Sequence, residues 1–256
     1  MNAFSWLTMC TGGMFFGILL LMWAGRHIGG QIAKRNTHAN TGFSALEGAL
    51  FGLMGLILAF SFSGAAARLD TRRQLIVDEA NCIGTAYLRL ILLPAEKQTE
   101  LRDMFREYVD IRLAACNTAP GSTKGNAVMS RSAALQNQIW TKAAAASQQM
   151  STTQAAILLL PALNAMFDIA NTHEMAKKMH PPEIIYILMI VLILICSLLA
   201  GFQMGFGKTR SFMHIVAFAV LLTITVYTII DLEYPRLGFL NVKSFDQVFI
   251  DLKNSM

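Results

Sequence analysis

Residues 43–93 read FSALEGALFGLMGLILAFSFSGAAARLDTRRQLIVDEANCIGTAYLRLILL and contain no proline. At about 1.5 Å per residue, an uninterrupted helix over this stretch is roughly 75 Å long. A lipid hydrocarbon core is only about 30 Å thick. The first part, residues 43–64, is apolar enough to cross a membrane, whereas charged residues become frequent from Arg68 onward. The stretch therefore predicts one helix that crosses a membrane and continues beyond it.

Three further apolar runs are each long enough for a transmembrane helix, which needs about 20 residues. They are residues 4–25, 184–207 and 212–232. Hydrophobic residues make up 54% of the 256 residues and charged residues only 14%, a balance that is unusual for a soluble protein. The sequence therefore predicts an all-α integral membrane protein with four transmembrane helices, and the lipid bilayer is its first expected partner.

The order of these runs divides the chain into four parts. We expect a first transmembrane hairpin at 1–64, a helical extramembrane domain at 65–182, a second hairpin at 183–232 and a C-terminal tail at 233–256. In the extramembrane domain a new helix is expected near Pro94, because proline is tolerated at a helix start but not in its interior. Residues 117–126 read as a loop. Residues 127–178 predict a long helix that is kinked or split at Pro161.

Small residues recur every three or four positions along the second apolar run and form one stripe. Its central members are Gly48, Gly52, Gly55 and Ala59. In lipid, small residues allow two helix backbones to approach closely. One interpretation is packing against the first helix, which offers Gly13 and Gly17. The other is that second helices from several subunits surround an axis, with Phe60 and Ser63 near a pore constriction.

Charged residues flank the membrane runs on the domain side. Arg68, Arg72 and Arg73 follow the second crossing, and Asp231 and Glu233 end the fourth, so their membrane depths are expected to match. Arginine and carboxylate at such an interface predict a structural clamp between helices. A ring of these arginines in an oligomer would instead attract anions.

Two other polar sets are candidates for function. Ionisable residues at membrane depth are costly when unpaired, which singles out Glu47 and His214 near the other membrane face. They either pair, form a titratable mouth or reach headgroup water. In the extramembrane part of the second helix, four polar side chains gather: Asp78, Glu79, Asn81 and Arg89. A salt-bridged helix face explains this set better than catalysis, because no nucleophile with an adjacent base accompanies it.

Enzymatic chemistry has no support in the sequence. The four cysteines are scattered, and none has a histidine partner at the spacing of a metal site. No phosphate-binding or nucleophile motif is present, so we expect no catalytic residue, no metal and no cofactor. The net charge of +5 lacks a basic stripe with interleaved aromatic residues, so we expect no nucleic acid partner.

Several motifs resemble a membrane family described as having a bestrophin-like domain. They are AFSFS at 59–63, EAN at 79–81, IGTAYLR at 83–89, GFQMG at 201–205 and DLEYPRLGF at 231–239. The order of membrane hairpin, helical domain and second membrane hairpin is also similar to that of true bestrophins. Bestrophins are pentameric channels, so the resemblance implies a homopentameric ion channel with the second helix around the pore. No compact acidic cluster for calcium follows the fourth crossing, where the tail carries only Asp246 and Asp251.

Two functional hypotheses remain. The first is a homo-oligomeric ion channel whose second transmembrane helix lines the pore, with the permeant ion undefined. The alternative is a non-conducting membrane scaffold or stress-related protein whose helical domain binds a partner. Basic residues are nearly balanced between the two membrane sides, so the positive-inside rule does not fix the topology. The resemblance favours a bacterial inner membrane, with both termini and the helical domain in the cytoplasm.

Overall fold

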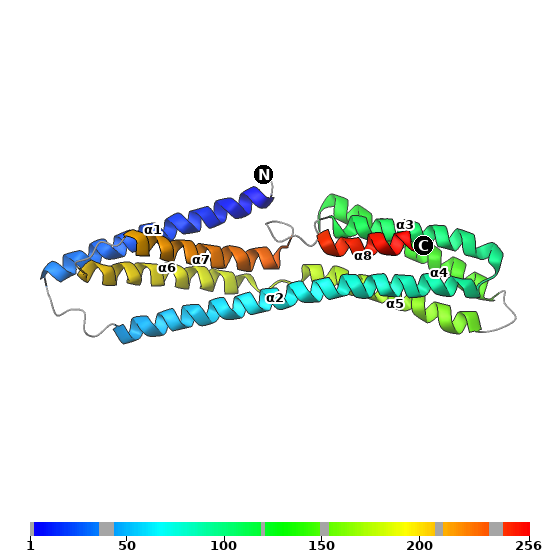
Figure 1. Cartoon of the computed structure of the whole chain (residues 1–256), viewed down its shortest axis with the longest axis horizontal. Coiled ribbons are helices and arrows are strands. Elements are labelled where there is room, and N and C mark those ends of the chain that lie inside the picture. The colour runs from blue at the N-terminus through cyan, green and yellow to red at the C-terminus, as the bar shows by residue number, and fades with distance from the viewer. Residues whose placement is uncertain (1–2, 36–43, 119–120, 149–153, 208–211, 236–242) are drawn as a thin grey trace. The chain divides into compact units, whose positions relative to one another are not determined.

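A computed structural model describes residues 3–35, 44–118, 121–148, 154–207, 212–235 and 243–256. In these ranges all regular structure is helical, as expected for an all-α membrane protein (Figure 1). The helices are α1 (Ala3–Arg35), α2 (Ser44–Arg89), η1 (Leu90–Leu92), α3 (Ala95–Cys116), α4 (Thr123–Gln148), α5 (Gln154–Lys178), α6 (Glu183–Phe206), α7 (Phe212–Glu233) and α8 (Lys243–Asn254).

The 46-residue helix α2 runs without a break through the stretch that predicted it, and Figure 1 shows it as one continuous ribbon. Its end follows from Pro94: the last turn tightens into the 3₁₀ helix η1, and Leu93 adopts an extended backbone. A residue before proline is sterically pushed out of the α region, so the helix ends there. The predicted new helix begins at Ala95.

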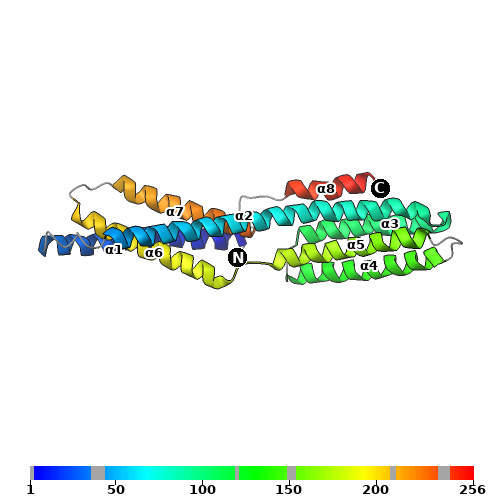
Figure 2. The same cartoon turned by 90° about the horizontal axis from the view of Figure 1, so that it is seen from below.

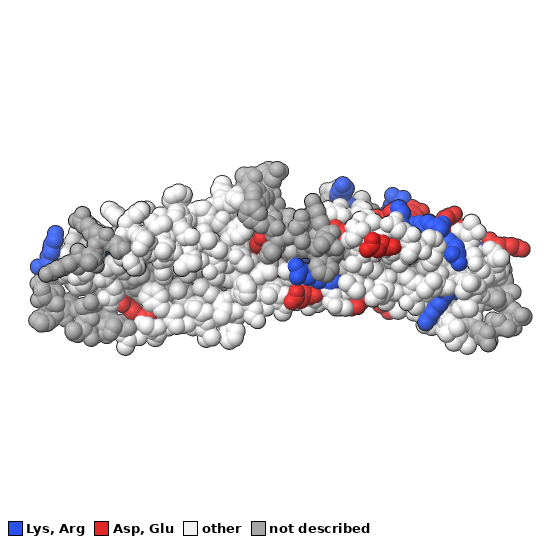
Figure 3. Space-filling view, in the orientation of Figure 1, with Lys and Arg blue, Asp and Glu red and all other residues white. Residues whose placement is uncertain are grey.

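Contacts divide the chain into two compact units. The first comprises Met1–Leu69 and His180–Asn241, and the second comprises Asp70–Met179 and Val242–Met256. Helices α1, α6, α7 and the first half of α2 belong to the first unit. Among the described residues, four helical segments are long and apolar enough to cross a membrane. On the face shown in Figure 3, the first unit is almost free of charged side chains, whereas Lys, Arg, Asp and Glu gather over the second.

Helices α1 and α6 make the closest helix pair of the first unit (Figure 2). Gly25 and Gly29 of α1 meet Gly201 and Gly205 of α6, and the glycines of each helix are four residues apart. A β-carbon on any of them would overlap backbone atoms of the other helix. Such spacing lets two membrane helices touch through their backbones. This contact also explains why α1 extends ten residues beyond the predicted run that ended at Gly25.

The second unit is a helical bundle in which α3 packs against α4, α4 against α5, and α8 against α3. The apolar face of α3 supplies much of its core: Leu101, Phe105, Tyr108 and Ala115 are buried at spacings of three, four and seven residues. This is the periodicity of a helix with one buried face. Phe249 of α8 is also fully buried. No helix was expected in the C-terminal tail, so α8 is an addition to the sequence-based description.

The expected split at Pro161 is wrong, because α5 runs through this proline. Helix α4 ends at Gln148 and α5 begins at Gln154. A proline removes one backbone hydrogen bond from a helix interior, and α5 accommodates that loss.

The glycine contact between α1 and α6 leaves no room for a β-carbon, so a larger residue at these positions is expected to destabilise the protein. Gly201→Ala is expected to lower the free energy of unfolding by about 1–3 kcal/mol, the usual effect of overpacking. The measurement is the midpoint of thermal unfolding of the full chain in one detergent. Gly13→Ala is the matched control, because nothing lies within 4 Å of a β-carbon there. Equal midpoints for the two variants would contradict the contact.

Candidate functional site

The outer face of α2 is the most distinctive surface of the chain. Eighteen residues make five helical turns, so Gly52 and Asp70 point in the same direction from the helix axis. The predicted small-residue stripe follows this line. Its central members, and Ser63 beyond them, are exposed within the single chain: Gly48, Gly52, Gly55, Ala59 and Ser63. The buried positions of this helix, such as Leu58 and Ala65, lie on the other side.

Packing of the stripe against the first helix is not what the structure contains. Nothing lies within 4 Å of a β-carbon placed at Gly48, Gly52 or Gly55, and the same holds for Gly13. Gly17 faces Leu194 of α6. Among the described residues, close glycine packing is made by α1 with α6, and no part of them covers the glycines of the α2 stripe.

Phe60 and Ser63, the predicted constriction residues, both lie in this outward region. The Phe60 residue is 69% exposed, and Ser63 is also exposed. At 100° per residue, Ser63 falls near the centre of the stripe and Phe60 near its edge. A large aromatic side chain therefore borders a strip of small ones.

The inner face of α2 carries the predicted clamp. Arg68 donates from Nε and Nη2 to Glu233 Oε2, at 2.8 and 2.7 Å. His180 Nδ1 donates to the other oxygen, Glu233 Oε1, at 2.9 Å, and its ring stacks on Tyr234. The Glu233 carboxylate is fully buried. Three charge-assisted hydrogen bonds therefore join α2, the end of α7 and the segment before α6.

The other clamp residues have different surroundings. Arg72 is buried and donates to the backbone carbonyls of Ala176 and Met179 at 3.2 and 2.9 Å, at the end of α5. Carbonyls at a helix C-terminus carry partial negative charge, so a guanidinium is well placed there. Arg73 lies 3.5 Å from Asp70 on the same helix. Asp231 is buried.

Glu47, the acidic residue near the other end of the crossing, is also on the inner face. It is buried and accepts a hydrogen bond from the Gln203 amide of α6. His214 is exposed at the start of α7.

The four polar residues predicted in the second half of α2 divide into one buried member and three that are partly or fully exposed. Glu79 is fully buried, whereas Asn81 is exposed. Asp78 accepts a hydrogen bond from Gln74 at 2.9 Å, and Arg89 donates to the Leu158 carbonyl at 2.6 Å. The four residues do not form one site, and Glu79 belongs to a larger cluster.

That buried cluster centres on Glu79 and Arg112 of α3. The guanidinium makes a two-pronged pair with the carboxylate, through Nε to Oε1 and through Nη2 to Oε2 at 3.1 Å. His173 Nδ1 donates to Glu79 Oε2 at 2.7 Å. Arg112 Nη2 also reaches Glu174 at 3.2 Å, and Lys177 donates to Glu174 at 2.7 Å. The negative charges of Glu79 and Glu174 are thus balanced by the positive charges of Arg112 and Lys177 in the core of the bundle.

Electrostatics explains the protonation states in this cluster. Burial alone raises the pKa of Glu79, but the charge of Arg112 and the hydrogen bonds from His173 and Arg112 outweigh it and lower the pKa to about 2. Burial lowers the pKa of His173, because a further proton would add an unbalanced positive charge to the core. Burial raises the pKa of Tyr108, a neighbour of Arg112, to about 12.

Arg112, His173, Glu174 and Lys177 were missed from the sequence, although a signal for Arg112 was present. Positions 101, 105, 108, 112 and 115 share one face of α3, and four of them are apolar or aromatic. A charged residue in such a series needs a buried partner of opposite charge. Positions 76, 79, 83 and 86 of α2 show the same pattern, with Glu79 as the charged member.

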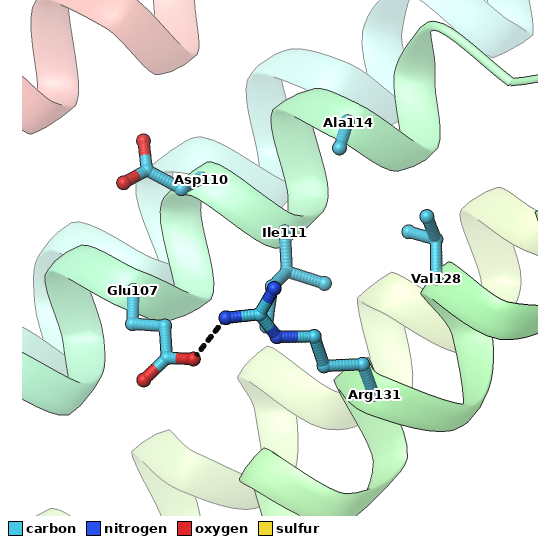
Figure 4. Close-up of a pocket in the computed structure, with 6 residues that line it drawn as sticks. All are labelled: Glu107, Asp110, Ile111, Ala114, Val128 and Arg131. Atoms are coloured by element: carbon cyan, nitrogen blue, oxygen red, sulfur yellow. Dashed lines mark hydrogen bonds and ion pairs between the residues drawn. The ribbon is translucent and has the colours of Figure 1, made fainter.

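A surface pocket of about 450 Å³ opens between α3 and α4 (Figure 4). Arg131 spans it and donates to Glu107 at 2.6 Å, while Lys253 of α8 binds the carboxylate of Asp110. These charges are satisfied among themselves. Across the described ranges, no group of three or more His, Cys, Asp or Glu is placed to hold a metal. The absence of enzymatic function stays a prediction.

Removal of one charge from the buried cluster is expected to be costly. Glu79→Gln leaves Arg112 without its main counter-charge and is expected to destabilise the protein by about 3–5 kcal/mol. Glu107→Gln is the control, since its pair with Arg131 is exposed on both sides and is worth less than about 1 kcal/mol. Thermal unfolding of both variants at neutral pH provides the comparison, and similar midpoints would argue against a buried pair.

The lowered pKa of His173 predicts a loss of stability in acid. Near pH 6.5 the unfolded chain takes up a proton at this histidine and the folded chain does not, so stability falls as the pH drops below that value. The unfolding midpoint of the wild type should therefore decrease between about pH 7.5 and 5.5. In His173→Gln the decrease should be smaller. An identical pH profile for the two proteins would exclude this origin.

Comparison with known proteins defines the family of the chain. No curated protein and no solved structure matches it. A family model described as the bestrophin-like domain matches residues 12–245, which include most of α1 and all of α2 to α7. The match also includes every motif on which the resemblance was based. The chain therefore belongs to the bestrophin-like domain family.

Proposed function

We propose that this protein is a homo-oligomeric ion channel whose pore is lined by α2. The observation that carries the proposal is the open small-residue stripe on a helix that is longer than a membrane crossing requires. Glycine in a helix interior is less favourable than alanine by about 1 kcal/mol. Gly48, Gly52 and Gly55 make no close side-chain-sized contact with the described residues that would offset this. An α2 helix of another subunit that approached closely would pack against all three glycines.

A ring of α2 helices explains both sides of this helix. Its inner face binds the rest of the subunit through Arg68 and Glu233, and through the buried apolar residues. Its outer face is then free to meet equivalent helices around an axis. Small side chains narrow such a ring without filling its centre, and Phe60 at the edge of the stripe supplies an apolar constriction that gates by dewetting.

Family membership supports the same arrangement by analogy, since bestrophins are pentameric channels. A fold relationship does not define an activity. We therefore rest the proposal on the open face of α2, with five subunits as the expected number. By the same analogy we place both chain ends and the second unit in the cytoplasm.

A scaffold function is the second candidate, and a different surface favours it. Leu88, Ile91, Ile157 and Leu158 are exposed in the second unit, where no lipid is expected to cover them. The bond from Arg89 to the Leu158 carbonyl joins the two segments that carry these side chains. Exposed apolar groups of this kind favour protein binding. A scaffold would bind a partner here without conducting ions.

Two measurements on the detergent-purified chain distinguish these functions. Native mass spectrometry gives the oligomeric state, for which we expect a closed ring of about five subunits. Ion flux in liposomes then tests conduction. A ring that passes ions supports the channel. A monomer, or a ring that passes no cation or anion at any voltage or pH, would leave the scaffold as the better proposal.

The stripe itself can be tested by one substitution. Gly52→Leu adds a bulky side chain to a surface that is open in the single chain, so the subunit should fold normally. In a ring the same side chain should block close approach and reduce the oligomer fraction by roughly tenfold, as expected for about 1–3 kcal/mol of overpacking. Gly13→Leu on α1 is the control, because its site is equally open. An unchanged oligomer in Gly52→Leu would remove α2 from the interface.

A further inference from the structure

We propose that the pore prefers cations to anions and that Asp70 is the residue that sets this preference. The inference rests on the proposed function, because it takes α2 as the pore-lining helix. It goes further by naming the class of permeant ion. The arginines beside the crossing had suggested an anion-attracting ring, and the structure assigns them a different role.

Asp70 lies on the line of the stripe. It follows Ser63 by seven residues, which is nearly two helical turns and about 10.5 Å along the helix axis. Its side chain is 74% exposed. A side chain at this position faces any axis that the stripe faces, just beyond the end of the apolar run at Gly64. Each subunit therefore presents one carboxylate at the mouth of the pathway.

The side chains of Arg68 and Arg72 point away from the outer face of α2. Arg68 is held by the buried carboxylate of Glu233 at 2.7 Å. Arg72 is buried and donates to carbonyls at the end of α5. Both lie about 160° around the helix from Asp70, that is, on the opposite face. Their charge is directed into the subunit, where Glu233 and the carbonyl dipoles offset it.

Arg73 is the remaining cation near the mouth. It lies at the edge of the outer face, with its side chain 34% exposed, and its contact with Asp70 is long at 3.5 Å. The charge of Arg73 therefore offsets part of the field of Asp70, although the pair itself contributes little stability. Farther along α2 the exposed positions Gln74, Asn81 and Thr85 are neutral. Asp78 adds a second carboxylate beside Gln74.

In a closed ring the Asp70 carboxylates repeat around the axis. Rings of aspartate or glutamate at a pore mouth concentrate cations and repel anions, and the effect increases where low-dielectric walls focus the field. Between Gly64 and Arg89, Arg73 is the one basic side chain of α2 that lies toward this ring, and the carboxylates of Asp70 and Asp78 outnumber it. The expected permeant class is therefore a small cation.

The test is the reversal potential of the full-length protein in liposome-derived membranes, with a roughly tenfold KCl gradient across the bilayer. The wild type should reverse near the equilibrium potential of K⁺. Asp70→Asn should reduce the K⁺ to Cl⁻ permeability ratio by about fivefold, the effect of one unit charge per subunit near the permeating ion. Asp70→Glu should restore it. Asp103→Asn is the control, because Asp103 is also exposed and bonded to an arginine three residues later.

The outcomes separate this inference from the proposed channel. Reversal near the Cl⁻ potential, or a K⁺ preference that Asp70→Asn leaves intact, would overturn the role of Asp70 while the channel stands. A folded ring that carries no current would overturn the channel itself. An equal loss of K⁺ preference in Asp103→Asn would also count against Asp70, because the effect would then come from surface charge in general.

Discussion

The passage of one unbroken helix from lipid into water is the constraint on which the rest of the structure depends. Backbone groups cannot be left unpaired in lipid, so α2 must remain helical throughout the crossing. The side chains on its inner face must then find partners in both surroundings. In the apolar part of α2 these partners are apolar side chains, and in the charged part they are groups of opposite charge or backbone carbonyls. Arg68, Arg72 and Glu79 recur on this inner face, and each has its partner within the subunit. The outer face of α2 makes none of these contacts with the described residues.

The arginines of the inner face direct their charge into the subunit. A guanidinium that binds a buried carboxylate, as Arg68 binds Glu233, offers little field outside the subunit. Buried pairs of this kind add little net stability compared with apolar packing, but breaking one is expensive. We infer that the Glu79 and Arg112 pair acts chiefly to fix which helices meet in the bundle. The same pair makes the second unit sensitive to loss of a single charge.

Much of the fold could be predicted from hydropathy and proline alone. Long apolar runs and the absence of proline before Pro94 defined α2, since these signals act along one segment of chain. The split expected at Pro161 was wrong, because the local penalty of a proline does not decide whether the folded helix accommodates it. Helix α8 was missed because its amphipathic pattern is short and its burial depends on contact with α3.

The candidate site was predictable in part. The stripe of α2 and the depth match of Arg68 with Glu233 follow from helical spacing. The partner choice did not follow from spacing. Glycines at helical spacing occur in both α1 and α2, and only the three-dimensional arrangement decides that Gly25 packs against Leu198 of α6 while Gly52 stays open. Arg112 shows the same limit, since its position on the α3 face signals a buried charge but not the identity of Glu79 as its partner.

The glycine contact between α1 and α6 also limits when α1 can pack during biosynthesis, because α6 is synthesised much later. Roughly 175 residues separate Gly25 from Gly201, and ribosomes add about 5–20 residues per second. Helix α6 is therefore synthesised roughly 10 to 35 seconds after α1, and until then α1 lies in the bilayer without this partner. During that time its glycine surface is covered only by lipid, by the insertion machinery or by neighbouring nascent chains. Helix α1 thus reaches α6 only after α2 to α5 have been synthesised.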